Sequence, residues 1–113
     1  MLTKITKPSE WFDIVLPRTV AEHPRRLGGF SGTFAFTITG ENGGDWSVTI
    51  SDSKAVVKKE ADPTAVFMVK MREEHFLSMM NGELSGPVAY ATGKLKFKGA
   101  LTQAIKLRGL LFA

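Results

Sequence analysis

Large apolar residues occupy every second position in two stretches of the chain, 33–39 and 46–51. This period is typical of a β-strand with one covered face. The segment 40–44 between them is rich in glycine and contains an asparagine, and both residue types tolerate the positive φ angles of a hairpin turn. A weaker strand over 54–60 carries lysines, as edge strands often do, because charge discourages pairing with another molecule. The first half of the chain therefore predicts an antiparallel meander.

The second half of the chain alternates strands and helices. A continuous apolar run over 65–71 predicts a strand in a central position of the sheet. Residues 73–81 predict a helix that begins with two acidic residues and ends before Gly82. In 94–98 the apolar residues face one side of a strand and three lysines face the other, and 101–112 predicts a terminal helix with a broad apolar face.

A further helix is predicted before the sheet. Ser9 can cap a helix that begins at Glu10, and the apolar residues of 11–16 fall on one helical face. Pro17 is expected to interrupt this helix, because its ring and its missing N–H disfavour a helix interior. Residues 1–8 are expected to form a loose segment.

These elements follow one another in the order α, β-β-β, β-α, β-α. Three of the strands have one apolar and one polar face, which indicates a sheet that is covered on one side only. We therefore expect an α+β fold, with a five-stranded, mainly antiparallel sheet and helices packed on one face. At 113 residues the chain is expected to be a single domain.

Composition narrows the possible classes of function. The chain has no cysteine, which excludes a disulfide framework, a thiolate metal site and a cysteine nucleophile. Its first residues lack the apolar segment of a secretory signal, and no apolar run approaches the ~18 residues of a transmembrane helix. We expect a cytoplasmic protein. Its net charge of +4 would attract nucleic acid, anionic lipid surfaces and acidic head groups alike.

The sequence offers no catalytic or metal-binding constellation. His23 and His75 are the only histidines, and no acid near His75 has the spacing of a metalloprotease helix. The segment 29–32 is not a nucleophile elbow, because Thr33 stands where the second glycine belongs. The segment 40–44 is too short for a phosphate-binding loop. We therefore expect no enzyme activity, no metal and no cofactor.

The three lysines of 94–98 raise the question of nucleic-acid binding. A protein that binds single strands needs aromatic side chains on the same exposed face as its cations, so that bases stack on them. Here the apolar residues of the strand point to the opposite face, so we expect no nucleic acid. Together with Arg25, Arg26 and Lys106, these lysines either lie on a solvated outer face or attract phosphate head groups of an anionic membrane.

Soft apolar side chains are frequent in the second half of the chain. Met68, Met71, Met79 and Met80 lie close together in the sequence, and methionine adapts its shape to varied apolar ligands, although it equally fills a core. The terminal helix has a wider apolar face than one core contact needs. A neighbouring helix, a dimer partner or a ligand is expected to cover it.

In their order and spacing, these segments resemble the sterol carrier protein 2 (SCP2) domain over about residues 11–112. The matching segments are Trp11-Phe12 with 15–17, 34–40 with 43–46, Ala61-Asp62-Pro63-Thr64, 76–82 and the lysine-rich 93–99. Two positions depart from the family pattern. Ala100 stands where the family usually has an aspartate that caps the last helix, and Met71-Arg72 stands where a Ser or Thr commonly caps the preceding one.

The resemblance implies a mixed sheet whose helices enclose a hydrophobic tunnel. It also implies non-catalytic binding and transfer of sterols, fatty acids, acyl-CoA or similar apolar lipids. We expect the ligand between the covered face of the sheet and the helices around Phe76 and Ile105. The expected ligand-binding residues are Phe76, Met79, Met80, Leu84, Tyr90, Leu101, Ile105, Leu107 and Leu111. Tyr90 offers its hydroxyl either to the polar end of a ligand or to a structural hydrogen bond.

An alternative function comes from a different class. Some family members serve as accessory or assembly domains, so the helical face could instead dock a partner or a second copy, for example in isoprenoid-quinone synthesis. An assembly module should elute as a dimer or complex without lipid, whereas a carrier should hold lipid as a monomer or a homodimer. Contact of a carrier with an anionic membrane surface would be transient.

Overall fold

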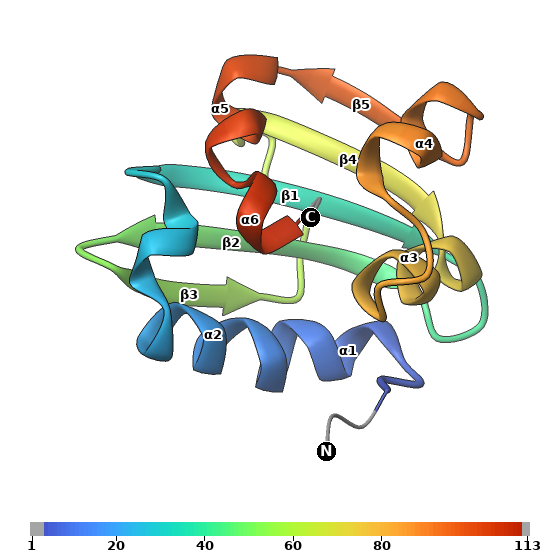
Figure 1. The fold of residues 1–113 in the computed structure, drawn as a ribbon, viewed down its shortest axis with the longest axis horizontal. Helices are drawn as coiled ribbons and strands as arrows, with labels where there is room; N and C mark the ends of the chain where they lie inside the picture. The colour runs from blue at the N-terminus through green and yellow to red at the C-terminus, as the bar shows by residue number, and fades with distance from the viewer. Residues whose placement is uncertain (1–3, 112–113) are drawn as a thin grey trace.

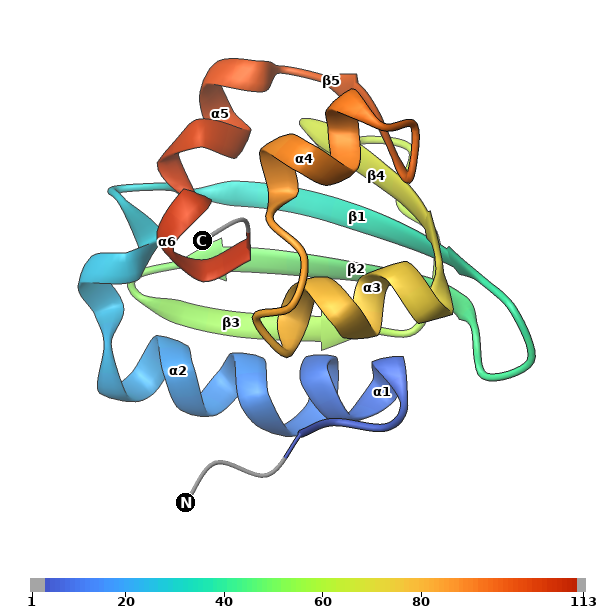
Figure 2. The ribbon, with the colours of Figure 1, turned by 45° about the vertical axis from the view of Figure 1, so that its right-hand side comes forward.

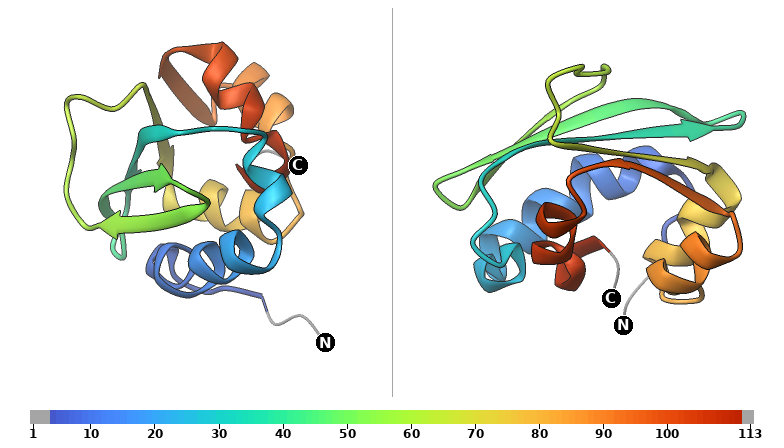
Figure 3. Two further views of the ribbon diagram at one scale, coloured as in Figure 1. Left: turned by 90° about the vertical axis from the view of Figure 1, so that its left-hand side faces the viewer. Right: turned by 90° about the horizontal axis from the view of Figure 1, so that it is seen from above.

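The computed structural model describes residues 4–111 of the chain. Its strands form a five-stranded sheet in the order β3-β2-β1-β4-β5, and every helix that it describes lies on the same face of this sheet (Figure 1 and Figure 3). The strands are β1 Gly32–Thr39, β2 Gly44–Ser51, β3 Lys54–Lys58, β4 Phe67–Arg72 and β5 Leu95–Gly99. The predicted α+β class with helices on one face is confirmed.

The helices are short and lie at both ends of the chain and between β4 and β5. They are α1 Pro8–Glu10, the π-helix η1 Trp11–Val15, α2 Leu16–Glu22, the 3-10 helix η2 Pro24–Leu27, α3 Glu73–Met80, α4 Gly86–Ala91, α5 Leu101–Lys106 and α6 Arg108–Leu111. None of the helices within residues 4–111 is long and apolar enough to cross a membrane.

The sheet is mixed because β1 and β4 run parallel, while its other neighbouring strands pair antiparallel. The chain reaches β4 by a long connection that passes over the sheet face opposite the helices (Figure 3).

Asp62 shapes the connection between β3 and β4: its carboxylate accepts hydrogen bonds from the Thr64 hydroxyl at 2.6 Å and the Thr64 N–H at 2.8 Å. These bonds, the hydroxyl first, lower the pKa of the Asp62 carboxyl. The Ala-Asp-Pro-Thr segment is thus an Asx turn.

Aromatic rings fill the centre of the core between the sheet and the N-terminal helices. Phe12 is fully buried and stacks on Trp46 of β2, with ring centroids 4.8 Å apart, and on Phe76 of α3, at 5.5 Å. Phe36 of β1 meets both phenylalanines edge to face. Because these rings come from four separate elements, they hold the N-terminal helices, the sheet and α3 together.

The first helix begins earlier than the sequence predicts. It starts at Pro8 and not at Glu10, and Ser9 lies inside it instead of capping it. The cap is instead made by a side chain within the helix that reaches back to the residues before it. The Glu10 carboxylate accepts hydrogen bonds from the backbone N–H groups of Thr6 and Lys7, each at 2.9 Å, and from the Thr6 hydroxyl at 2.8 Å. The Thr6 N–H bond, followed by the hydroxyl bond, lowers the pKa of Glu10.

Pro17 does not interrupt this helix, contrary to the sequence-based expectation. The preceding turn widens into the π-helix η1, in which the Leu16 N–H donates to the carbonyl of Trp11, five residues earlier. In a regular α-helix the proline ring would clash with the carbonyl four residues before it. The wider π turn relieves this clash, so the chain continues directly into α2 with Pro17 in its first turn.

Ile5, within the segment that the sequence predicts to be loose, is hydrogen-bonded to the end of α3. Asn81, at the end of α3, accepts a hydrogen bond from the Ile5 N–H at 2.9 Å and donates one to the Ile5 carbonyl at 3.1 Å. Its amide therefore pairs with the Ile5 backbone as a neighbouring strand would. Pro8 is buried as it begins α1. Residues 1–3 lie outside the described residues.

The predicted terminal helix is in fact two short helices. Leu107 separates α5 from α6 with φ −96° and ψ 11°, outside the helical range. The end of α5 packs closely on η2, since a Cβ atom on Gly28 would collide with the Lys106 carbonyl. The break turns Leu107 and Leu111 into the core, while Leu101 and Ile105 stay exposed. Phe112, the last apolar residue of the predicted helix, lies outside the described residues.

Ala100→Asp is expected to raise the free energy of unfolding by about 0.5–2 kcal/mol. Ala100 is the N-cap of α5, has an extended backbone and makes no side-chain cap bond, so an aspartate there could accept from the free N–H groups of the first turn. Urea unfolding followed by circular dichroism measures the gain. Ala100→Leu, which cannot cap, is the control, and equal stability of the two variants would contradict the prediction.

Candidate functional site

The structure divides the predicted ligand-binding residues into three groups. Phe76, Met79, Leu107 and Leu111 are buried in the core, and Met80 and Leu84 are partly buried against it. The three others lie at the surface: Tyr90 is 63% exposed, Leu101 62% and Ile105 51%.

Phe76 belongs to the aromatic centre of the core. It stacks on Phe12 and meets Trp11 edge to face, with ring centroids 5.9 Å apart. Its neighbours therefore include the N-terminal helix, whereas Ile105 lies at the surface on α5. The two residues chosen from the sequence as the centre of the site thus differ in both burial and surroundings.

The helices on the covered face form two groups beyond the N-terminal ones. One group is α3 with α4, and the other is α5 and α6, which contact each other and η2. In the chain α4 precedes β5 and α5 follows it, and Figure 2 shows both helices in front of the sheet. The helix-facing surface of β4 and β5 is apolar: Val69 and Leu95 are buried, and the half-buried Phe97 stacks on Phe67 at 5.5 Å.

Exposed apolar side chains occur on both of these helices. They are Val88 and Tyr90 on α4, and Leu101 and Ile105 on α5, and we call them the α4–α5 rim. Large apolar side chains are common singly at a protein surface, whereas a contiguous patch of them is typical of an interaction site. Val88 was not among the residues predicted from the sequence, and only its 51% exposure in the fold identifies it.

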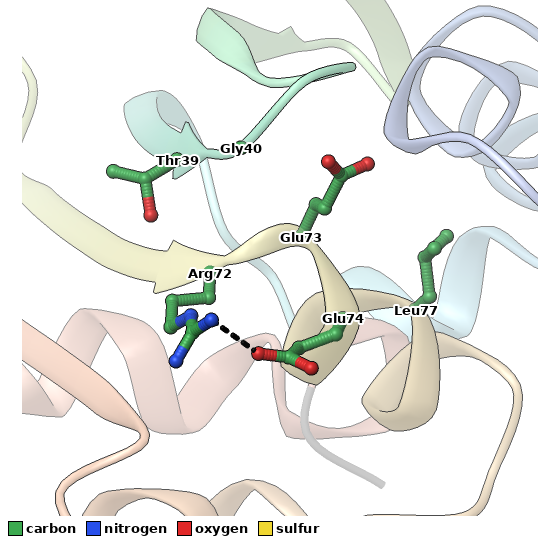
Figure 4. A pocket seen from close by; sticks show the side chains of 6 residues that line it. All are labelled: Thr39, Gly40, Arg72, Glu73, Glu74 and Leu77. Carbon is green, nitrogen blue, oxygen red and sulfur yellow. Dashed lines mark ion pairs between the residues drawn. The ribbon is translucent and has the colours of Figure 1, made fainter.

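Two polar clefts lie elsewhere, around the end of β4. The first, shown in Figure 4, has a volume of about 410 Å³ and is lined by Thr39, Gly40, Arg72, Glu73, Glu74 and Leu77. Arg72 and Glu74 form an ion pair across it at 2.9 Å. The second, of about 400 Å³, is lined by Thr39, Lys70, Met71, Arg72, His75, Gly93, Lys94 and Lys96. Neither cleft contains any of the residues predicted to bind lipid.

The described part of the chain holds no cluster of three His, Asp or Glu side chains that could bind a metal ion. His75 has a buried Nδ1 without a hydrogen-bond partner in the described residues, and it stands among lysines in the second cleft. A nucleophile paired with a base would be needed for covalent chemistry.

The model of the SCP-2 sterol transfer family matches residues 12–112, and the chain belongs to this family. Hydroxysteroid dehydrogenase-like protein 2 of Rattus norvegicus is 35% identical over 79 residues, which cover 69% of this chain and 15% of that protein. The chain therefore spans only a small part of this curated relative. The family assignment supports lipid binding or transfer in general.

Solved structures share the same fold. The sterol carrier protein domain 2 of Helicoverpa armigera superimposes with a TM-score of 0.77 at 19% identity, covering 96% of this chain and 92% of that one. Palmitated SCP2L2 from Aedes aegypti gives a TM-score of 0.65 at 20% identity, covering 90% and 92%. The SCP2-like architecture is thus retained although few residues are shared.

Proposed function

We propose that this chain binds and transfers an apolar lipid without catalysis. The observation that carries the proposal is the exposure of the four apolar side chains of the α4–α5 rim, on the two helices that precede and follow β5. An apolar tail lying on the helix-facing surface of β4 and β5 would cover side chains that otherwise face water. The sequence likewise predicts that something covers the wide apolar face of the last helices.

Entry of the ligand would require the two helical groups to move apart. Phe67, Val69 and Leu95 are packed closely under the helices, so the tunnel implied by the family would open as the lipid replaces these contacts. The helices α4, α5 and α6 are only six, six and four residues long, which makes them the elements most easily displaced. Met80 and Leu84, which are partly buried, would line the inner end of the tunnel. The α4–α5 rim would line the mouth of the tunnel.

The energetics favour a fatty acid or a ligand of similar length. Each methylene removed from water contributes about 0.8 kcal/mol, so about ten methylenes give a gross ~8 kcal/mol before the costs of association and helix displacement. The Aedes aegypti relative of the same fold was solved in palmitated form. The exposed Tyr90 would offer its hydroxyl to a carboxylate at the mouth. Sterols and acyl-CoA remain within the same proposed class.

Nucleic acid is not part of the proposal. The aromatic residue of β5, Phe97, is half-buried on the helix side, while Lys96 and Lys98 are exposed on the other side. A nucleic acid bound to these lysines would have no aromatic side chain of β5 on the same face for its bases to stack on. A monomer or a homodimer would serve a carrier equally well.

Native mass spectrometry of the purified protein, followed by organic extraction and lipid analysis, tests the proposal. We expect a discrete added mass that is recovered as a lipid, and uptake of a fluorescent fatty acid by the delipidated protein. A clean unliganded mass with no uptake would contradict it. If that protein also eluted as a dimer or complex, the assembly module would become the better explanation.

A further inference from the structure

The second polar cleft places cations of two neighbouring strands side by side. Lys70 of β4 and Lys96 of β5 are directly opposite each other in the antiparallel register. Both are exposed, and their strand neighbours Val69, Met71 and Leu95 are buried under the helices. Because side chains alternate along a strand, both lysines project from the uncovered face of the sheet.

Two more cations and a histidine complete this cleft. Arg72, two residues after Lys70, and Lys94, two residues before Lys96, also line it, together with His75 from the first turns of α3. We call Lys70, Arg72, Lys94 and Lys96 the cationic cleft. Its volume is about 400 Å³.

Little negative charge compensates these side chains. No Asp or Glu is among the described residues that line the cleft. Arg72 pairs with the exposed Glu74, but no ion pair within residues 4–111 involves Lys70, Lys94 or Lys96. Asp45, two strands away, instead accepts a hydrogen bond from the Thr37 hydroxyl at 2.6 Å.

Protection of the sheet edge explains only part of this arrangement. β5 is an edge strand, and lysines on it discourage pairing with other chains. β4 lies between β1 and β5, so Lys70 and Arg72 protect no edge. Like charges directly opposite each other on neighbouring strands destabilise a sheet. A bound anion would remove this repulsion.

We propose that the cationic cleft binds a phosphate group. A phosphate monoester carries almost two negative charges and three acceptor oxygens, which match the three lysines and the arginine that line the cleft. A carboxylate, with one charge, would leave most of the cleft uncompensated. Lys70 and Lys96 lie on the uncovered face of the sheet, and the cleft shares no residue with the α4–α5 rim, so the proposal is independent of lipid binding on the helix side.

The test compares two double variants of equal charge. Lys70→Gln with Lys96→Gln removes the opposed pair of the cleft, whereas Lys54→Gln with Lys58→Gln removes two exposed lysines from β3, the other edge strand. Inorganic pyrophosphate is titrated while backbone amide shifts are followed by NMR. We expect saturable shifts centred on residues 70–72 and 93–96, and binding weakened about tenfold or more in the cleft variant only, because each lost charge-assisted bond is strong.

A second series identifies the source of the phosphate group. Vesicles of phosphatidylcholine mixed with phosphatidylglycerol are compared with vesicles of phosphatidylcholine alone, using both double variants. Pyrophosphate binding that depends on the cleft supports a free phosphate compound, and cleft-dependent binding to the anionic vesicles alone supports a lipid headgroup. Equal binding by the two double variants, or no binding by the unaltered protein to either probe, overturns the proposal. Fatty acid uptake should be the same in both variants.

Discussion

Met80→Trp is expected to abolish fatty acid uptake while leaving the protein folded. Met80 ends α3 and is only partly buried against the core. If the lipid enters between the two helical groups, an indole at this position would occupy the inner end of its path. Uptake is measured with a fluorescent fatty acid on delipidated protein, and the fold is checked by circular dichroism and urea unfolding.

Met68→Trp is the matched control, because it introduces the same ring on the uncovered face of the sheet. Met68 is 37% exposed on β4 between the buried Phe67 and Val69, so its side chain points away from the helices. Uptake should be unchanged in this variant. If Met80→Trp instead lost about 1–3 kcal/mol of stability by overpacking and still took up lipid normally, Met80 would belong to a filled core and not to the ligand path.

Phe12→Ala is expected to lower the free energy of unfolding by about 3–5 kcal/mol, which is a large part of the stability of a domain of this size. Phe12 is fully buried and touches Trp46, Phe76, Phe36 and Trp11 through ring contacts. Its removal leaves a cavity that rigid aromatic neighbours fill poorly. Urea unfolding monitored by tryptophan fluorescence and by circular dichroism gives the difference.

Ile14→Ala provides the comparison within the same π-helix. Ile14 is 53% exposed, so its loss should change stability by no more than about 0.5 kcal/mol. A similar cost for both substitutions would mean that the N-terminal helix contributes through its own helical propensity and not through the aromatic core. The contrast therefore tests whether the predicted first helix is held by tertiary packing.

The two faces of the sheet have separate chemistry, and this separation could be predicted from the sequence. In 94–98 the alternation of lysines with Leu95 and Phe97 already indicated one charged and one apolar face, and the structure confirms it. The hairpin of β1 and β2 was predicted from the same alternation, the edge position of β3 from its lysines, and the interior position of β4 from its continuous apolar run. These features depend on residues that are close together in the sequence, which are the same wherever the strand lies.

The residues of the candidate site were harder to predict from the sequence than the strands were. The sequence selected Phe76 and Tyr90 alike because both are large and apolar, yet one is fully buried and the other is 63% exposed. Burial depends on which elements pack over a residue, and that is decided by segments far away in the chain. The same limit applies to Val88, which the sequence did not single out.

The sequence by itself determined the strand segments and the apolar and charged faces of the sheet, because each follows from residues close together in the chain. The missing cap at Ala100 was predicted from the resemblance to the SCP2 family. Only the tertiary structure decided the rest. The parallel pairing of β1 with β4 and the opposition of Lys70 to Lys96 arise from non-local hydrogen bonding. The break at Leu107 arises because packing on the core outweighs the small free-energy differences between helical conformations.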